Sequence, residues 1–289
     1  MMQQRAASFS RPPSGWAWAL TGALTGALMA LLIHWPAQWL AQALAHASQG
    51  QVQLQETQGS VWQGSGKLVL TGGDGSRDAM ALPGRISWQL NLTPQGMALP
   101  HLHLQLMAPC CMTQAAQLQL SAQVNPPNGP WAWQFQMGDH RSQWPAHLLS
   151  GFGAPWNTLQ PEGNLILTTQ HLQVQGMSGQ TALLGQLQLT AENMSSKLST
   201  LRPMGTYQVN LGTTTATASA SDATLGATPV LSLTTLSGSL LLNGQGQWQG
   251  NHFQFRGEAS AVPEHAAALS NLLNIIGRRQ GARSLLSLG

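Results

Sequence analysis

The two cysteines of the chain, Cys110 and Cys111, are adjacent and follow Pro109. In an oxidising compartment, two cysteines of one chain tend to pair. Adjacent Cα atoms lie ~3.8 Å apart across a trans peptide, below the usual disulfide range of ~4.4–6.8 Å. A bridge between neighbours would therefore be easily reduced and would fix a tight turn. Three states are open: a vicinal disulfide, two free or buried thiols, and a link to another chain.

Two histidines are spaced for one face of a strand. Since His101 and His103 are two residues apart, both imidazoles could bind one metal ion. A metal site needs a third ligand, and no cluster of Cys, His or acidic residues lies near them in the sequence. We therefore expect solvated histidines on a polar face, with Leu102 and Leu104 pointing inward, and no metal.

Catalytic and cofactor motifs are incomplete. Gly64-Ser65-Gly66-Lys67 resembles part of a phosphate-binding loop, but the first glycine is missing and Leu68 stands where Ser or Thr would coordinate Mg²⁺. We expect a turn there. The nine acidic residues lie far apart, which argues against paired carboxylates in acid–base catalysis. The sequence predicts a protein that is not an enzyme and holds no cofactor.

Charge is scarce along the whole chain. Asp, Glu, Lys and Arg make up 7% of the residues, against about 25% in typical domains. The net charge is +3, and the twelve basic residues are scattered rather than gathered on one stripe. This distribution argues against nucleic-acid binding. Since 43% of the residues are hydrophobic, the composition also argues against disorder.

A charge-free apolar segment over residues 15–36 is long enough to cross the ~30 Å hydrocarbon core as a helix. Trp16 and Trp35 stand near its two ends, as in the aromatic belts of membrane proteins. Arg5 and Arg11 precede it, which predicts a cytoplasmic stub over 1–14 and a periplasmic remainder. The protein is thus expected in the bacterial inner membrane as a single-pass protein.

Two further features of this region bear on its interpretation: a candidate cleavage site and a pair of glycines. The segment could instead be a cleaved signal peptide, because Ala43-Leu44-Ala45 resembles a cleavage site; however, the apolar run is too long and the site lies well beyond its end. Gly22 and Gly26 have the spacing that lets a partner helix approach closely, and we predict helix packing at these two positions.

After residue 50, apolar and polar residues alternate in short runs separated by Gly, Pro, Asn and Asp. This alternation is typical of antiparallel strands with one buried and one wet face, and about a dozen strands result. We predict a mainly β fold with a large curved antiparallel sheet that forms an open barrel or groove. The periplasmic β domain is assigned to 51–289, with a linker over 37–50.

Two segments break the alternation. Residues 145–152 begin at proline and end in glycines, which predicts a short mid-chain helix. A C-terminal amphipathic helix is predicted from Pro263 to Gly277. Its apolar stripe consists of Leu269, Leu272, Leu273, Ile275 and Ile276. This helix either plugs one end of the sheet or, through the arginines after it, touches lipid headgroups.

The order of several segments resembles protein N of the bacterial type II secretion system over nearly the whole chain. These segments are the stub and anchor, Gly59-Ser60-Val61-Trp62-Gln63-Gly64, residues 82–90 (LPGRISWQL), residues 153–163 (GAPWNTLQPEG), and a terminal Trp-Gly-rich hairpin with its helix. The resemblance implies no catalytic residues, and it implies structural roles for Gly59, Trp62 and Gly64.

The resemblance also implies a function. We expect an accessory inner-membrane component that helps folded periplasmic proteins cross the outer membrane, with other secretion components and exoprotein as partners. A remoter likeness to periplasmic β-sheet proteins with an apolar groove supports an alternative, an anchored lipid-binding protein with lipid in that groove. A third reading, from the eleven tryptophans, is a secreted carbohydrate-binding domain.

Overall fold

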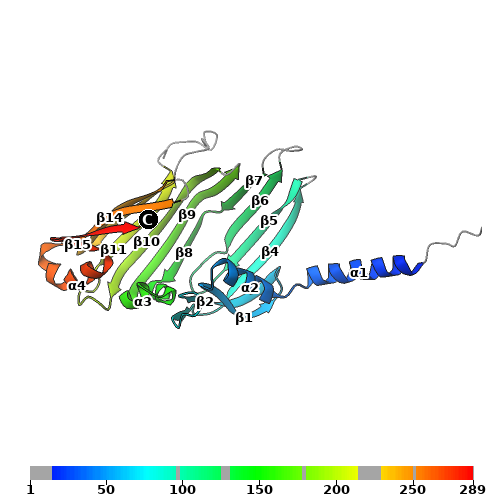
Figure 1. Cartoon of the computed structure of the whole chain (residues 1–289), viewed down its shortest axis with the longest axis horizontal. Helices are drawn as coiled ribbons and strands as arrows, with labels where there is room; N and C mark the ends of the chain where they lie inside the picture. The colour runs from blue at the N-terminus through cyan, green and yellow to red at the C-terminus, as the bar shows by residue number, and fades with distance from the viewer. Residues whose placement is uncertain are drawn as a thin grey trace, which may run out of the picture.

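A computed structural model describes residues 15–95, 98–124, 131–177, 180–213, 229–249 and 252–288. Its sixteen strands form one antiparallel sheet in the order β1-β2-β4-β5-β6-β7-β9-β10-β11-β12-β13-β14-β16-β15, with β3 added to β2 and β8 to β9. The outermost strands do not pair with each other, so the sheet is open (Figure 1). The prediction of a mainly β fold with a large open antiparallel sheet is confirmed.

The strand bounds are β1 (Val52–Gly59), β2 (Gln63–Thr71), β3 (Ala79–Ala81), β4 (Ile86–Gln95), β5 (Ala98–Met107), β6 (Ala116–Val124), β7 (Trp131–Met137), β8 (His140–Pro145), β9 (Pro161–Met177), β10 (Gln180–Ser196), β11 (Gly205–Thr213), β12 (Pro229–Gly238), β13 (Leu240–Gln249), β14 (His252–Ala261), β15 (Arg278–Gln280) and β16 (Arg283–Leu288). Most neighbours in sequence are also neighbours in the sheet, as antiparallel hairpins require.

Helix α1 (Gly15–Ile33) lies in the segment predicted to cross the membrane. Its described side chains are exposed, including Trp16 at 74% and Leu24 at 73%. Within the described ranges, no helix meets the length and apolarity expected of a membrane span. Figure 1 shows α1 projecting away from the sheet beside β1.

The segment predicted as a linker, residues 37–50, is largely helical. Helix α2 (Ala37–Ala47) packs against β1. Five of its eleven residues are alanine, the strongest helix former. Ala37 is buried, and Leu40 and Leu44, four residues apart, are partly buried. The linker assignment stays a prediction, and the structure adds that these small and apolar residues give the segment a helical face that packs on the sheet.

Both predicted helices of the β domain are present. The mid-chain one is a 3₁₀ helix, η1 (Ala146–Phe152), followed by α3 (Trp156–Leu159). Near the C-terminus, η2 (Pro263–His265) leads into α4 (Ala266–Ile276). The chain then continues from Gly277 into the short strands β15 and β16, which the sequence did not predict.

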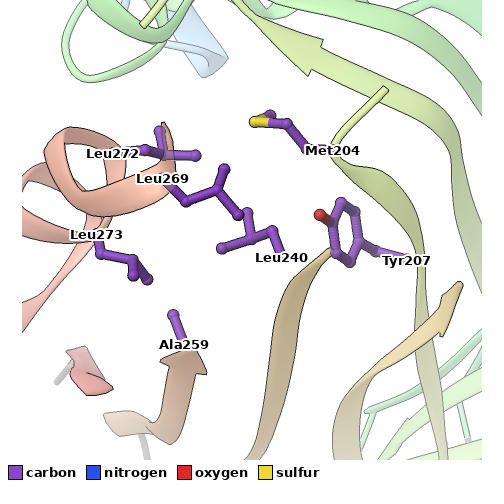
Figure 2. Close-up of a cluster of buried hydrophobic side chains, with 7 residues drawn as sticks. All are labelled: Met204, Tyr207, Leu240, Ala259, Leu269, Leu272 and Leu273. Carbon is purple, nitrogen blue, oxygen red and sulfur yellow. The ribbon is translucent and has the colours of Figure 1, made fainter. Parts of the chain in front are cut away.

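Two hydrophobic clusters hold the helices to the sheet. The first, the α4 cluster, packs α4 on β11, β13 and β14, as Figure 2 shows, and its buried members are Met204, Tyr207, Leu240, Ala259, Leu269, Leu272 and Leu273. The second, the η1 cluster, packs η1 near β2 and β3, and its buried members are Leu82, Ala108, Cys111 and Leu148. Ala191 packs against the α4 cluster and Trp144 against the η1 cluster, both partly buried. The position of α4 agrees with a helix that plugs one end of the sheet.

Candidate functional site

The sheet has one continuous apolar face. Residues directly opposite on antiparallel strands point to the same side. A first row of such partners runs across six strands through Leu92, Leu102, Leu120, Phe135, Val174 and Leu183. A second runs through Leu187, Leu211, Leu231, Gly246 and Phe255. We call this side of the sheet the apolar face.

The helices cover one end of the apolar face. Trp144 in the η1 cluster pairs with Leu165, and Leu165 pairs with Ala191, which packs in the α4 cluster. Both clusters therefore lie on the same side of the sheet as the two rows. Toward the other strand ends, Leu92 remains 47% exposed and Leu120 43% exposed. The apolar face is thus plugged at its helix end and partly open to solvent toward the other strand ends.

The opposite face is polar and carries few charged side chains, among them Arg256 and Glu258. One row of cross-strand partners on it consists of Asn91, His103, Gln119, Gln136 and Gln173. The Gln136 amide Nε2 donates to Gln173 Oε1 at 3.4 Å. Glutamine amides thus take the place of the charged side chains that usually cover a wet sheet face.

The two strand histidines lie on the polar face, as the alternation predicted. The ring centroids of His101 and His103 are 6.4 Å apart. Among the residues that the structure describes, no group of three or more His, Cys, Asp or Glu side chains could hold a metal ion.

The segment Gly64–Lys67 was expected to form a turn and instead lies inside β2. The turn comes just before it, at residues 60–62, where Ser60 N donates to Gln63 O at 2.9 Å. Glycine is needed at position 64 because a Cβ atom there would lie 2.5 Å from the ring of Trp88. Gly64 therefore makes room for an aromatic ring rather than for a phosphate, whereas a Cβ atom at Gly66 would meet the side chain of Thr57.

Of the hairpin positions Gly59, Trp62 and Gly64, Trp62 connects the sheet to α1. Gly59 has φ +89°, a conformation that favours glycine. The Trp62 indole Nε1 donates to the carbonyl of Leu32 at 2.7 Å, and Val61 N donates to Trp35 O at 2.8 Å. The hairpin thus holds the end of α1 by side-chain and backbone hydrogen bonds.

Gly22 and Gly26 lie on α1, and apart from their chain neighbours and the backbone of this helix no described atom lies within 4 Å of a Cβ placed at either position. The space beside both glycines is open to another molecule. Helix packing at these positions stays a prediction, since it requires a partner.

The adjacent cysteines are joined to each other in the loop between β5 and β6, with their Cα atoms 3.8 Å apart. Cys110 is exposed, whereas Cys111 is 7% exposed and packs in the η1 cluster.

Two buried polar groups carry no signal in the sequence. His140 Nε2 and the Tyr207 hydroxyl are buried and have no hydrogen-bond partner within the described chain. Burial lowers the pKa of His140 and raises the pKa of Tyr207. The Tyr207 hydroxyl lies in the α4 cluster (Figure 2). Each is the only residue of its type in its strand. Its burial depends on the helices or strands that pack against it, which the neighbouring sequence does not reveal.

A family model described as type II secretion system (T2SS), protein N, matches residues 50–285 of the chain. The match begins just after α2 and includes nearly the whole sheet together with α4. Comparisons with curated proteins and with solved structures yield no match.

Proposed function

Because the chain belongs to the type II secretion system protein N family, we propose that it acts as an accessory inner-membrane component of that secretion machinery. In this role it helps folded periplasmic proteins cross the outer membrane. The observation that carries the proposal is the family match over 50–285, which covers the β domain from its first strand. The proposal assigns no catalytic step to the chain.

Membrane anchoring is a finer part of the proposal. It is supported by the exposed apolar side chains of α1, among them Leu24, Leu31 and Ile33, which no part of the described chain covers. Exposed apolar surface of this extent is costly in water and favours burial in lipid or against another helix. The arginines before α1 favour a cytoplasmic N-terminus and a periplasmic sheet.

Partner binding is the other finer part. Gly22 and Gly26 offer a path for the close approach of a helix from another inner-membrane component of the system. The sheet, which extends from β1 beside α1 to β15 at the far edge, offers its faces to other components and to exoprotein.

Deletion of the chain in cells that secrete a type II exoprotein tests the proposal. We expect exoprotein to accumulate in the periplasm, with secretion restored by the full chain, and we expect the full chain to co-purify with inner-membrane components of the system. Unchanged secretion together with no such partner would refute the proposal.

The apolar face supports a second candidate function, lipid binding. Its two rows contain no charged or hydrogen-bonding side chain, and they remain partly open to solvent. Acyl chains need contact with apolar groups and no polar partner, so the chemistry of this face suits them. The carbohydrate-binding reading is weaker, because the exposed Trp133 belongs to this apolar face rather than to the polar one.

Two substitutions one residue apart test lipid binding. Leu120→Glu places a charge on the apolar face, and Gln119→Glu places the same charge on the polar face. The full chain, extracted in mild detergent, is examined by native mass spectrometry for retained lipid. We expect Leu120→Glu to lower lipid retention roughly tenfold and Gln119→Glu to leave it unchanged. Equal retention in the two variants, or no lipid on the wild-type chain, would rule out this candidate.

A further inference from the structure

The disulfide between Cys110 and Cys111 has two unequal halves. Cys110 is exposed, and Cys111 packs with Leu82, Ala108 and Leu148 in the η1 cluster. We propose that this pair is a thiol–disulfide exchange site, reduced by an external protein dithiol, and that its redox state controls how firmly the loop between β5 and β6 is held to β8. The proposal does not depend on membrane anchoring or on lipid binding.

The exchange site is accessible. A surface hollow lies beside the disulfide, and its lining includes Cys110, Cys111, Arg141, Gln143 and Asn164. Arg141 is exposed and lines the same hollow as the two cysteines, so it contributes a positive charge to the lining of the hollow. A nearby cation stabilises thiolates, both the attacking one and the one that leaves. The hollow therefore combines access for a reductant with a charge that favours exchange.

The reaction balances with a dithiol as the reductant. One of its thiolates attacks Sγ of the exposed Cys110, a bond forms between these two sulfurs, and the bond to Sγ of Cys111 breaks. The electron pair leaves on Cys111, which takes a proton from water. The second thiolate of the reductant then attacks the other sulfur of the reductant, which is bonded to Cys110 in the mixed disulfide. This step releases Cys110, which is protonated in turn. Two electrons pass from the dithiol, now a disulfide, to the chain.

The loop is attached to β8 next to this pair. Gln143 N donates to Cys111 O at 2.8 Å, and Met112 forms a β-bridge with Ser142. Within the loop, the amides of Cys111 and Met112 both donate to Ala108 O at 2.9 Å. The disulfide fixes the turn that places the backbone carbonyl of Cys111 against β8. Reduction frees the two side chains to adopt separate rotamers and weakens this attachment, so the edge of the η1 cluster loosens.

The first test measures exchange on the folded full chain. The chain, purified under oxidising conditions, is incubated with dithiothreitol without denaturant, and alkylated thiols are counted by mass spectrometry. We expect reduction in the native state, slowed by Arg141→Gln roughly threefold to tenfold because the lining of the hollow loses a positive charge. Arg256→Gln, on β14 beside another hollow, is the control and should leave the rate unchanged. Free thiols at the start, reduction that requires unfolding, or equal rates in both variants would overturn the proposal.

The second test measures the consequence. Hydrogen exchange at the Gln143 amide should become roughly tenfold faster after reduction, while amides in β10 and β11 stay protected. The double variant Cys110→Ser with Cys111→Ser should show the same faster exchange at Gln143 without any reductant. An unchanged Gln143 amide in the reduced chain would show that the disulfide does not control the loop.

Discussion

The indole Nε1 of Trp62 donates a hydrogen bond at 2.7 Å to the backbone carbonyl of Leu32, thirty residues earlier in the chain. The last carbonyls of a helix have no partner within the helix, and Leu32 stands one residue before the end of α1. The hairpin of the sheet thus caps the helix from outside. The direction of α1 is thereby tied to the first two strands of the sheet.

Trp62→Phe should loosen this junction, because an aromatic ring remains at the position while the indole N–H donor is lost. The loss of one hydrogen bond costs about 1 kcal/mol, which corresponds to roughly fivefold faster local opening. Exchange of the Val61 amide, which donates to Trp35 O, measures it. Trp144→Phe is the control, since it removes a similar bond, from Trp144 Nε1 to Ser142 Oγ at 2.9 Å, away from the junction. Equal Val61 exchange in wild type and Trp62→Phe would show that the bond does not hold α1.

Leu24→Lys should release the chain from membranes. A lysine at the centre of a membrane helix costs about 2.5–3.5 kcal/mol, and Leu24 lies near the middle of α1. Carbonate extraction of cell membranes, followed by detection of the full chain, measures attachment. Leu236→Lys makes the same change at a leucine that is 55% exposed on the sheet, and it should stay in the membrane fraction. Wild-type chain that washes off with carbonate would contradict the anchor.

Tyr207→Phe should stabilise the fold by about 1 kcal/mol, because it removes a buried hydroxyl that has no hydrogen-bond partner in the described chain. The ring keeps its place in the α4 cluster. Denaturant unfolding of the full chain in detergent measures the difference. Tyr207→Leu is the comparison, and it should destabilise the chain because it loses ring volume in the core. A destabilised Tyr207→Phe variant would reveal a partner for the hydroxyl.

His140→Gln should flatten the dependence of stability on pH. Burial lowers the pKa of His140 below its ordinary value of 6.5, so the unfolded chain binds a proton more readily than the folded chain. The contribution of neutral His140 to the free energy of unfolding is therefore fully present above pH 6.5. This contribution is lost as the pH falls through the pKa of His140 in the folded chain.

The measurement is the free energy of unfolding at about pH 7.5 and about pH 5. The difference between these two values should shrink in His140→Gln. His252→Gln, a change at an exposed strand residue, serves as the control and should keep the wild-type difference. An unchanged difference in His140→Gln would show that this side chain accepts its proton without penalty.

The alternation of apolar residues with glutamine was sufficient to predict most of the strands and an antiparallel sheet. It also predicted the side to which His101 and His103 point, since a period of two places alternate residues on opposite faces. The helix α4 followed from its leucine spacing and from Pro263. These features are local, so residues within about ten positions determine them.

The rest depends on contacts between distant residues. Helix α2 resembled a linker because its apolar side is made of alanine and two leucines, and it becomes a packing face through its contact with β1. The strand β15 consists of two arginines and a glutamine, which show no alternation, and it exists through its pairing with β16. The apolar face likewise emerges from the register of many strands, which no single segment contains.

Site-specific crosslinking in cells tests the central claim most directly. A photoreactive residue is placed at Gly22 or Gly26 of the full chain, where the described structure leaves open space, and at Leu236 as a reference position. The account predicts that the two α1 positions capture an inner-membrane component of the type II secretion system, in cells whose exoprotein secretion is intact. Capture of no such component from any position, in cells whose secretion is unaffected by loss of the chain, would contradict it.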